Sequence, residues 1–208
     1  MRLAIRGRHA RAAAHTKGRG REGQGQALVE FAIVFPLFWM LLVAFIEFAF
    51  VFNAVLSVSF VSRNAALIAA EAADSATADC SILHSVETGF SAPATSKQVQ
   101  KVDIYWTNAN GVIQSGAITT YTRSSSASIS CKVNGVAFTV PYNLTANGYP
   151  WTARCSNRAG CGGAHTGLDT IGVKVTYLYT YKTPYGAVLG GTGWTLDRAS
   201  EMRIEPYQ

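Results

Sequence analysis

Two carboxylates stand in a part of the sequence where a charge is costly. Glu30 and Glu47 both lie within an apolar stretch that runs from about residue 26 to residue 52. A charged side chain in the hydrocarbon core of a bilayer costs about 2.5–3.5 kcal/mol on insertion scales, so it needs a partner or a task. Glu30 is either solvated at the headgroup boundary or paired with a cation. Glu47 lies either at the outer membrane interface or against a partner helix.

Four cysteines form the second set of reactive residues: Cys80, Cys131, Cys155 and Cys161. An even number of cysteines outside the cytoplasm predicts two disulfides. Three pairings are open, one of which joins Cys155 to Cys161 and leaves Cys80 with Cys131. A metal site would use Cys155, Cys161 and His165. However, C-x5-C is not a usual zinc spacing, and a fourth ligand is missing.

The histidines and the remaining motifs give little support to an enzyme. His9 and His15 precede the apolar stretch, which leaves only His84 and His165 after it. The sequence contains no nucleophile elbow, no P-loop and no paired-carboxylate spacing. We therefore expect a protein that is not an enzyme and needs no cofactor or metal.

The charge of the chain is concentrated at its start. The formal net charge is +6, and residues 1–25 carry seven basic side chains and one acidic side chain. The remainder is therefore neutral, which argues against nucleic acid as a partner. A basic segment directly before an apolar run is typical of a cytoplasmic flank under the positive-inside rule. The N-terminus is expected in the cytoplasm and the rest beyond the membrane.

The elements that position these residues follow from the apolar pattern. The 22 residues from Phe31 to Phe52 would span about 33 Å as a helix, close to the thickness of one bilayer core. We expect a basic leader over residues 1–25, a single transmembrane helix over 26–52 and a helical stalk over 53–74. An extracytoplasmic, β-rich domain should follow over residues 75–208.

Short strand signals lie in the last part of the chain. The stretch "QVQKVDIYW" alternates in polarity, and "SISCKVNGVAFTVPY" contains an Asn134-Gly135 pair that is typical of a hairpin. In "TIGVKVTYLYTY" the valines and tyrosines fall on one face, and "WTLDRASEMRIEP" can return as a final strand. The predicted fold class is α+β, with a long N-terminal helix and a small, mostly antiparallel β domain.

The start of the apolar helix resembles a type IV prepilin. In that family a dedicated peptidase cuts on the cytoplasmic side after a glycine, and four residues separate that glycine from a glutamate. The corresponding residues here are Gly25, the stretch "QALV", Glu30 and then Phe31. The resemblance implies a pilin-like fold and cleavage between Gly25 and Gln26.

A narrower resemblance covers about residues 19–74 and 170–207. The stretches "GQALVEFAIVFPLFWMLLVAFIEFAFVFNAVLSVSFVSRNAALIAA" and "RASEMRIEPY" are similar to TadE-like proteins of the tight-adherence (Flp, type IVb) pilus system. This implies a minor pilin or pseudopilin in the inner or plasma membrane that acts in pilus assembly, adhesion or secretion. Its partners would be the prepilin peptidase, other pilins or pseudopilins of the Tad apparatus, and membrane lipid. The alternative is an uncleaved, single-pass adhesin or binding module with a β ectodomain.

The resemblance also gives Glu30 a hypothetical task. Cleavage after Gly25 would remove the basic leader and create an α-amine on Gln26. In an assembly of packed helices a buried carboxylate is tolerable only when it is paired. We expect Glu30 to pair with the amine of a neighbouring subunit, with Phe31 and Glu47 as further assembly residues.

Overall fold

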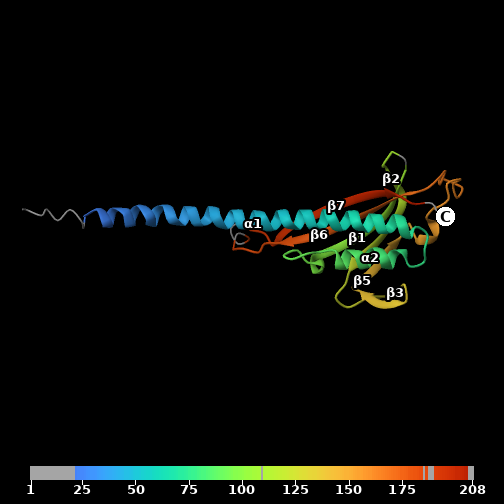
Figure 1. Cartoon of the computed structure of the whole chain (residues 1–208), viewed down its shortest axis with the longest axis horizontal. Coiled ribbons are helices and arrows are strands. Elements are labelled where there is room, and N and C mark those ends of the chain that lie inside the picture. The colour runs from blue at the N-terminus through green and yellow to red at the C-terminus, as the bar shows by residue number, and fades with distance from the viewer. Residues whose placement is uncertain (1–21, 109, 185, 187–189, 206–208) are drawn as a thin grey trace, which may run out of the picture. The chain divides into compact units, whose positions relative to one another are not determined.

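A single long helix and two antiparallel sheets dominate the structure (Figure 1). The computed structural model describes residues 22–108, 110–184, 186 and 190–205. The chain divides into two units, Met1–Leu42 and Val43–Gln208. Helix α1, Glu22–Ala72, contributes its first part to one unit and its second part to the other. Most of the predicted basic leader lies outside the described residues.

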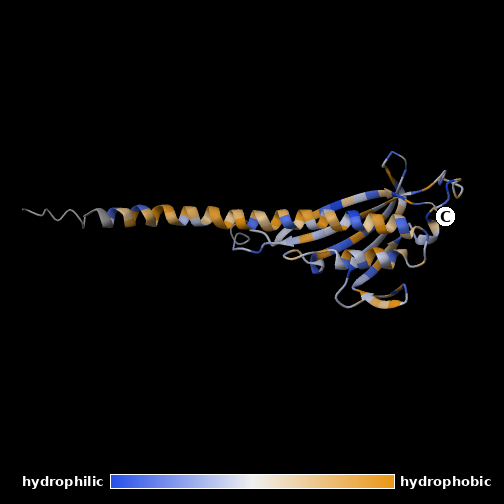
Figure 2. Cartoon of the chain, viewed as in Figure 1, coloured by the Kyte–Doolittle hydropathy of each residue, from blue (hydrophilic) through white to orange (hydrophobic). Residues whose placement is uncertain are grey.

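In the first unit the described side chains, from Gly25 onward, are exposed up to residue 41. They include large apolar residues on all sides of the helix, and Figure 2 shows this part of α1 as mostly orange. A helix that is hydrophobic all round needs a covering of lipid or protein. The segment Gly25–Ala72 is long and apolar enough to cross a membrane, with a mean hydropathy of 2.4 in a window that is wholly unburied.

In the second unit α1 lies in the hydrophobic core. Its buried face consists of small residues that recur at helical spacing: Ala54, Val58, Val61, Ala65, Ala66, Ala69 and Ala70. Small side chains let a backbone approach closely, and the Ser62 hydroxyl donates to the carbonyl of Val173 at 2.9 Å. Residues 53–74 were expected to form a helical stalk that continues the span. Helix α1 does continue to Ala72, and its residues from Ala54 onward pack in the core of the second unit.

The main sheet has five strands in the order β5-β2-β1-β6-β7, and all of its neighbouring strands are antiparallel. The strands are β1 (Val99–Thr107), β2 (Ile113–Arg123), β5 (Tyr142–Asn147), β6 (Thr170–Thr180) and β7 (Gly193–Arg203). In β6, Ile171, Val173, Val175, Tyr177 and Tyr179 are buried. This alternation is the one that the sequence predicts, and the predicted α+β fold is confirmed.

Helix α1 and strand β6 run in opposite directions. Glu47 contacts Tyr179, whereas Ser62, fifteen residues further along α1, contacts Val173, six residues earlier in β6. Fifteen helical residues rise about 22 Å. Six strand residues span about 20 Å. The two elements therefore lie side by side in register over this distance.

A second helix, α2 (Ala78–Thr88), was not expected from the sequence, which predicted a β-rich domain from residue 75 onward without placing a helix in it. It buries Ile82, Leu83 and Val86. A disulfide from Cys80 to Cys131 joins α2 to β3 (Ile129–Val133), which pairs with β4 (Val136–Val140). Two short 3-10 helices, η1 (Ser96–Gln98) and η2 (Trp151–Ala153), complete the fold. Eleven residues rich in polar side chains form a helix here because of this tertiary packing.

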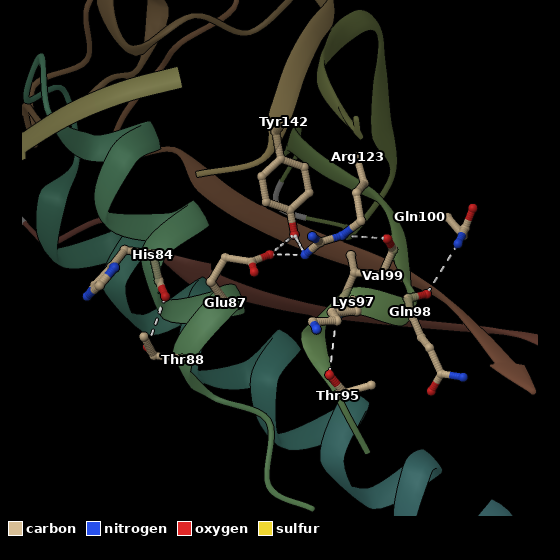
Figure 3. Close-up of polar contacts among 10 residues, drawn as sticks. All are labelled: His84, Glu87, Thr88, Thr95, Lys97, Gln98, Val99, Gln100, Arg123 and Tyr142. Atoms are coloured by element: carbon tan, nitrogen blue, oxygen red, sulfur yellow. Dashed lines mark hydrogen bonds and ion pairs between the residues drawn. The ribbon is translucent and has the colours of Figure 1, made fainter. Parts of the chain in front are cut away.

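A polar cluster ties α2 to the sheet (Figure 3). The Arg123 guanidinium forms an ion pair with Glu87 and donates to the carbonyl of Val99 at 3.0 Å. The Tyr142 hydroxyl donates to Glu87 at 2.7 Å, and the guanidinium lies 5.0 Å from the centre of the Tyr142 ring. Burial, followed by the Glu87 carboxylate, raises the pKa of Tyr142 above its usual value. Because Glu87, Arg123 and Tyr142 are paired with one another, the cluster fixes α2 against β1, β2 and β5.

Candidate functional site

The predicted cleavage site lies in the first turns of α1. Gly25 and Gln26 are helical and exposed, and a Cβ added to Gly25 would meet no atom within 4 Å. The first turn of a helix lacks intrahelical partners for its N–H groups. Glycine also lowers helix stability by about 1 kcal/mol relative to alanine. The bond between Gly25 and Gln26 is therefore accessible and lies in a part of the helix that unwinds at low cost.

Glu30 lies one turn further along and has a partner that the sequence did not indicate. The Gln26 side-chain amide donates to Glu30 Oε1 at 3.1 Å, and both side chains are exposed. A spacing of four residues places two side chains on the same helix face. Among the described residues no cation pairs with this carboxylate. Glu30 thus keeps one oxygen available for a partner from outside the chain.

An aromatic stripe begins next to Glu30. Phe31 is 60% exposed, and its ring centroid lies 5.1 Å from that of Phe35, which in turn lies 6.2 Å from that of Trp39. These residues recur every four positions and form a ridge on the helix. An exposed apolar surface of this kind is typical of a region that contacts lipid or another protein.

Glu47 is bound within its own chain. It is only 6% exposed, and four groups donate to its carboxylate. The donors are the Tyr179 hydroxyl, the Thr183 hydroxyl at 2.6 Å, the Thr183 N–H at 2.9 Å and the Lys182 N–H at 3.2 Å. Buried charge is tolerated when hydrogen bonds satisfy it. Neither sequence-based interpretation of Glu47 included this site, because its donors lie more than 130 residues away in the sequence.

A comparison with family models identifies the segment that contains these residues. Residues 25–67 match the TadE family model, described as TadE-like protein. This segment is TadE-like. The match begins at Gly25, includes both Glu30 and Glu47, and ends within the buried half of α1. No curated protein and no solved structure matches the chain.

The cysteines lie outside the TadE-like segment and are all paired. Cys80 is joined to Cys131, and Cys155 is joined to Cys161. Of the three pairings that the sequence left open, this is the one that closes a short loop at residues 155–161. Because both sulfurs of the zinc alternative are bonded to each other, they are not thiolates that could bind a metal. His165 instead contacts Asp169.

The TadE-like segment therefore carries two carboxylates in different environments. Glu30 is exposed and accepts one hydrogen bond from an amide of its own helix. Glu47 is buried and accepts from four donors of the second unit. Only Glu30 has the freedom to bind a charged group of another molecule. Glu47 instead fixes α1 against the end of β6.

Proposed function

We propose that this protein is a TadE-like pseudopilin, a minor pilin-like subunit that takes part in assembly of a tight-adherence (Flp, type IVb) pilus. The observation that carries the proposal is the family match, which starts at Gly25 and includes Glu30. The exposed apolar surface of α1 supports it, because such a surface suits a subunit whose helix packs first in lipid and then among other helices. The role is structural, in adhesion or secretion, and not enzymatic.

In this proposal the membrane segment is shorter than the sequence indicated. Residues 26–46 remain once the residues from Glu47 onward are assigned to the folded domain. These 21 residues span about 31 Å, which matches one bilayer core. The basic residues before them place the N-terminus in the cytoplasm. The two disulfides favour an extracytoplasmic domain.

Processing and assembly follow as two steps. A prepilin peptidase cuts after Gly25, removes the basic leader and leaves an α-amine on Gln26. The helix then leaves the lipid and packs against other pilins or pseudopilins of the Tad apparatus. There, Glu30 of one subunit pairs with the amine of its neighbour. The attraction is strong because the surroundings have a low dielectric constant, and the pair sets the stagger of the helices.

The first experiment tests cleavage. The full chain is co-expressed with a prepilin peptidase, extracted from membranes, and its N-terminus is sequenced. A chain that begins at Gln26 supports the proposal. We expect Gly25→Val to remain uncut and Gly23→Val, the matched control two residues earlier, to be cut normally. A wild-type chain that keeps its leader would instead favour the uncleaved, membrane-anchored adhesin.

The second experiment tests the role of Glu30. Glu30→Gln keeps the shape of the side chain but removes its charge, so we expect normal cleavage and loss of co-assembly with other Tad subunits. Glu71→Gln, a neutralised exposed glutamate later in α1, serves as the control and should assemble normally. Unchanged co-purification of the Glu30→Gln chain with its partners would contradict the proposed ion pair.

A further inference from the structure

A cavity of about 340 Å³ opens where three strands of the main sheet end. It is bounded by the last residues of β1, the first residue of β6, the last residue of β7 and the loop that precedes β6. Pockets that bind small molecules range from about 300 to 1,000 Å³, so this one has room for a single ring-sized group. All of its lining residues lie outside the TadE-like match.

One wall of the cavity is a stacked pair of rings. The centroids of Trp106 and His165 lie 4.2 Å apart, with the ring planes inclined by 20°. Asp169, which is 2% exposed, fixes the imidazole by accepting from His165 Nδ1 at 2.6 Å. Its other oxygen accepts from the Tyr149 hydroxyl at 2.7 Å and the Cys155 N–H at 2.9 Å. The wall is thus preorganised, and the Cys155–Cys161 disulfide closes the loop beside it.

The lining of the cavity also carries a positive charge with no partner among the described residues. Arg203, the last residue of β7, lines the cavity, and its guanidinium forms no hydrogen bond or ion pair with any of them. The only carboxylate in the lining, Asp169, is already engaged. A guanidinium presents a planar fork of donors that matches a carboxylate. Asn108 and Thr166 add polar groups to the lining.

We propose that this cavity binds an acidic sugar, that is, a saccharide unit bearing a carboxylate. The Arg203 guanidinium holds the carboxylate. The ring lies against the Trp106–His165 wall, since aromatic surfaces cover the apolar faces of a ligand while polar groups around them fix its orientation. A long polyanion fits less well, because a nucleic acid or a highly sulfated chain needs a row of cations and this cavity has one.

The position of the cavity suits recognition of an external ligand. Thr170 lines it at the start of β6, whereas Glu47 is held by Tyr179 near the opposite end of the same strand. Nine strand residues separate these points by about 30 Å. The cavity therefore lies at the end of the sheet remote from the point where α1 enters the folded unit. This inference does not depend on cleavage after Gly25.

The test is a binding measurement on the full chain in lauryldimethylamine oxide micelles, a detergent without a sugar headgroup. Glucuronate, glucose, acetate and inorganic phosphate are titrated separately and followed by saturation-transfer NMR and calorimetry. We expect glucuronate to bind with a dissociation constant on the order of 1 mM, as is usual for a small, polar ligand. The other three probes should bind at least tenfold more weakly.

Two variants of β7 locate the site. Arg203→Gln should weaken glucuronate binding by about tenfold or more, the usual effect of losing a charge-assisted hydrogen bond. Arg198→Gln removes an exposed arginine of the same strand outside the cavity, and it should bind as the wild type does. Equal binding by Arg203→Gln, or no saturable binding of glucuronate by the wild type, would overturn the proposal. If acetate or phosphate binds as tightly as glucuronate, the assignment of the ligand as a sugar is wrong.

Discussion

The hydrogen bonds of Glu47 provide the most quantitative test of the structure. Glu47→Gln keeps the size of the side chain but removes its charge and one of its two acceptors. The Tyr179 hydroxyl is the most deeply buried donor, since Tyr179 is 2% exposed, whereas Lys182 is an exposed residue. A hydrogen bond to a charged group contributes about 1.5–3 kcal/mol. We expect the variant to lower the free energy of unfolding of residues 43–208 by about 2–3 kcal/mol.

The assay is thermal unfolding of the full chain in detergent, followed by the near-ultraviolet circular dichroism of its tyrosines and tryptophans. For a domain of this size a loss of 1 kcal/mol lowers Tm by about 2–4 °C, so the expected drop is about 5–10 °C. Glu71→Gln should leave Tm unchanged. The double variant Glu47→Gln/Tyr179→Phe should lose less than the sum of the single losses, because the residues share one bond. Additive losses, or an unchanged Tm for Glu47→Gln, would refute this reasoning.

Three further perturbations test other parts of the fold. Replacing Cys80 and Cys131 by serine removes a disulfide with a sequence separation of 51. The free energy of unfolding in denaturant should then fall by about 4 kcal/mol. Removal of the shorter disulfide should lower it by about 2 kcal/mol. Burial raises the pKa of Tyr142, so its contribution to stability is complete below about pH 10 and declines as the pH rises further; Tyr142→Phe should flatten this part of the stability–pH profile. Gly172→Ala places a Cβ 2.3 Å from the Tyr105 ring and should cost about 1–3 kcal/mol by overpacking.

Each of these three predictions has a result that would contradict it. If removal of either disulfide lowers the free energy of unfolding by the same amount, the length of the closed loop is not the cause of their stabilising effect. A profile that declines above pH 10 in Tyr142→Phe as it does in the wild type would assign the decline to other groups. Wild-type stability of Gly172→Ala would mean that the Tyr105 ring moves aside freely, and crystallography or NMR of that variant would show its position.

The sequence predicts those elements whose pattern is local. The apolar residues of α1, the alternation from Ile171 to Tyr179 and the Asn134-Gly135 turn each depend on neighbours in the chain. The turn adopts the expected left-handed conformation, with φ of 49° and 82°. The pattern of the Gly25–Glu30 stretch likewise gave the candidate cleavage site, although cleavage itself stays a prediction.

Features that depend on distant residues could not be predicted. The partners of Glu47 are 132 to 136 residues away, and nothing near Tyr179 or Thr183 indicates that a carboxylate binds there. Helix α2 has few strong helix formers and is stabilised by packing and by Cys80. The buried alanines from Ala54 onward predicted a helix with a small-residue surface, but not that a sheet covers it.

The antiparallel alignment of α1 and β6 also determines how the domain responds to tension. A pull on the N-terminal side of α1 acts along the helix axis and tends to slide the helix past β6. The bonds of Glu47 to Tyr179, and of Ser62 to Val173, are then loaded together in shear rather than opened one after another. Shear geometry distributes a force over many contacts at once. A domain built in this way can remain folded while a force is applied along α1.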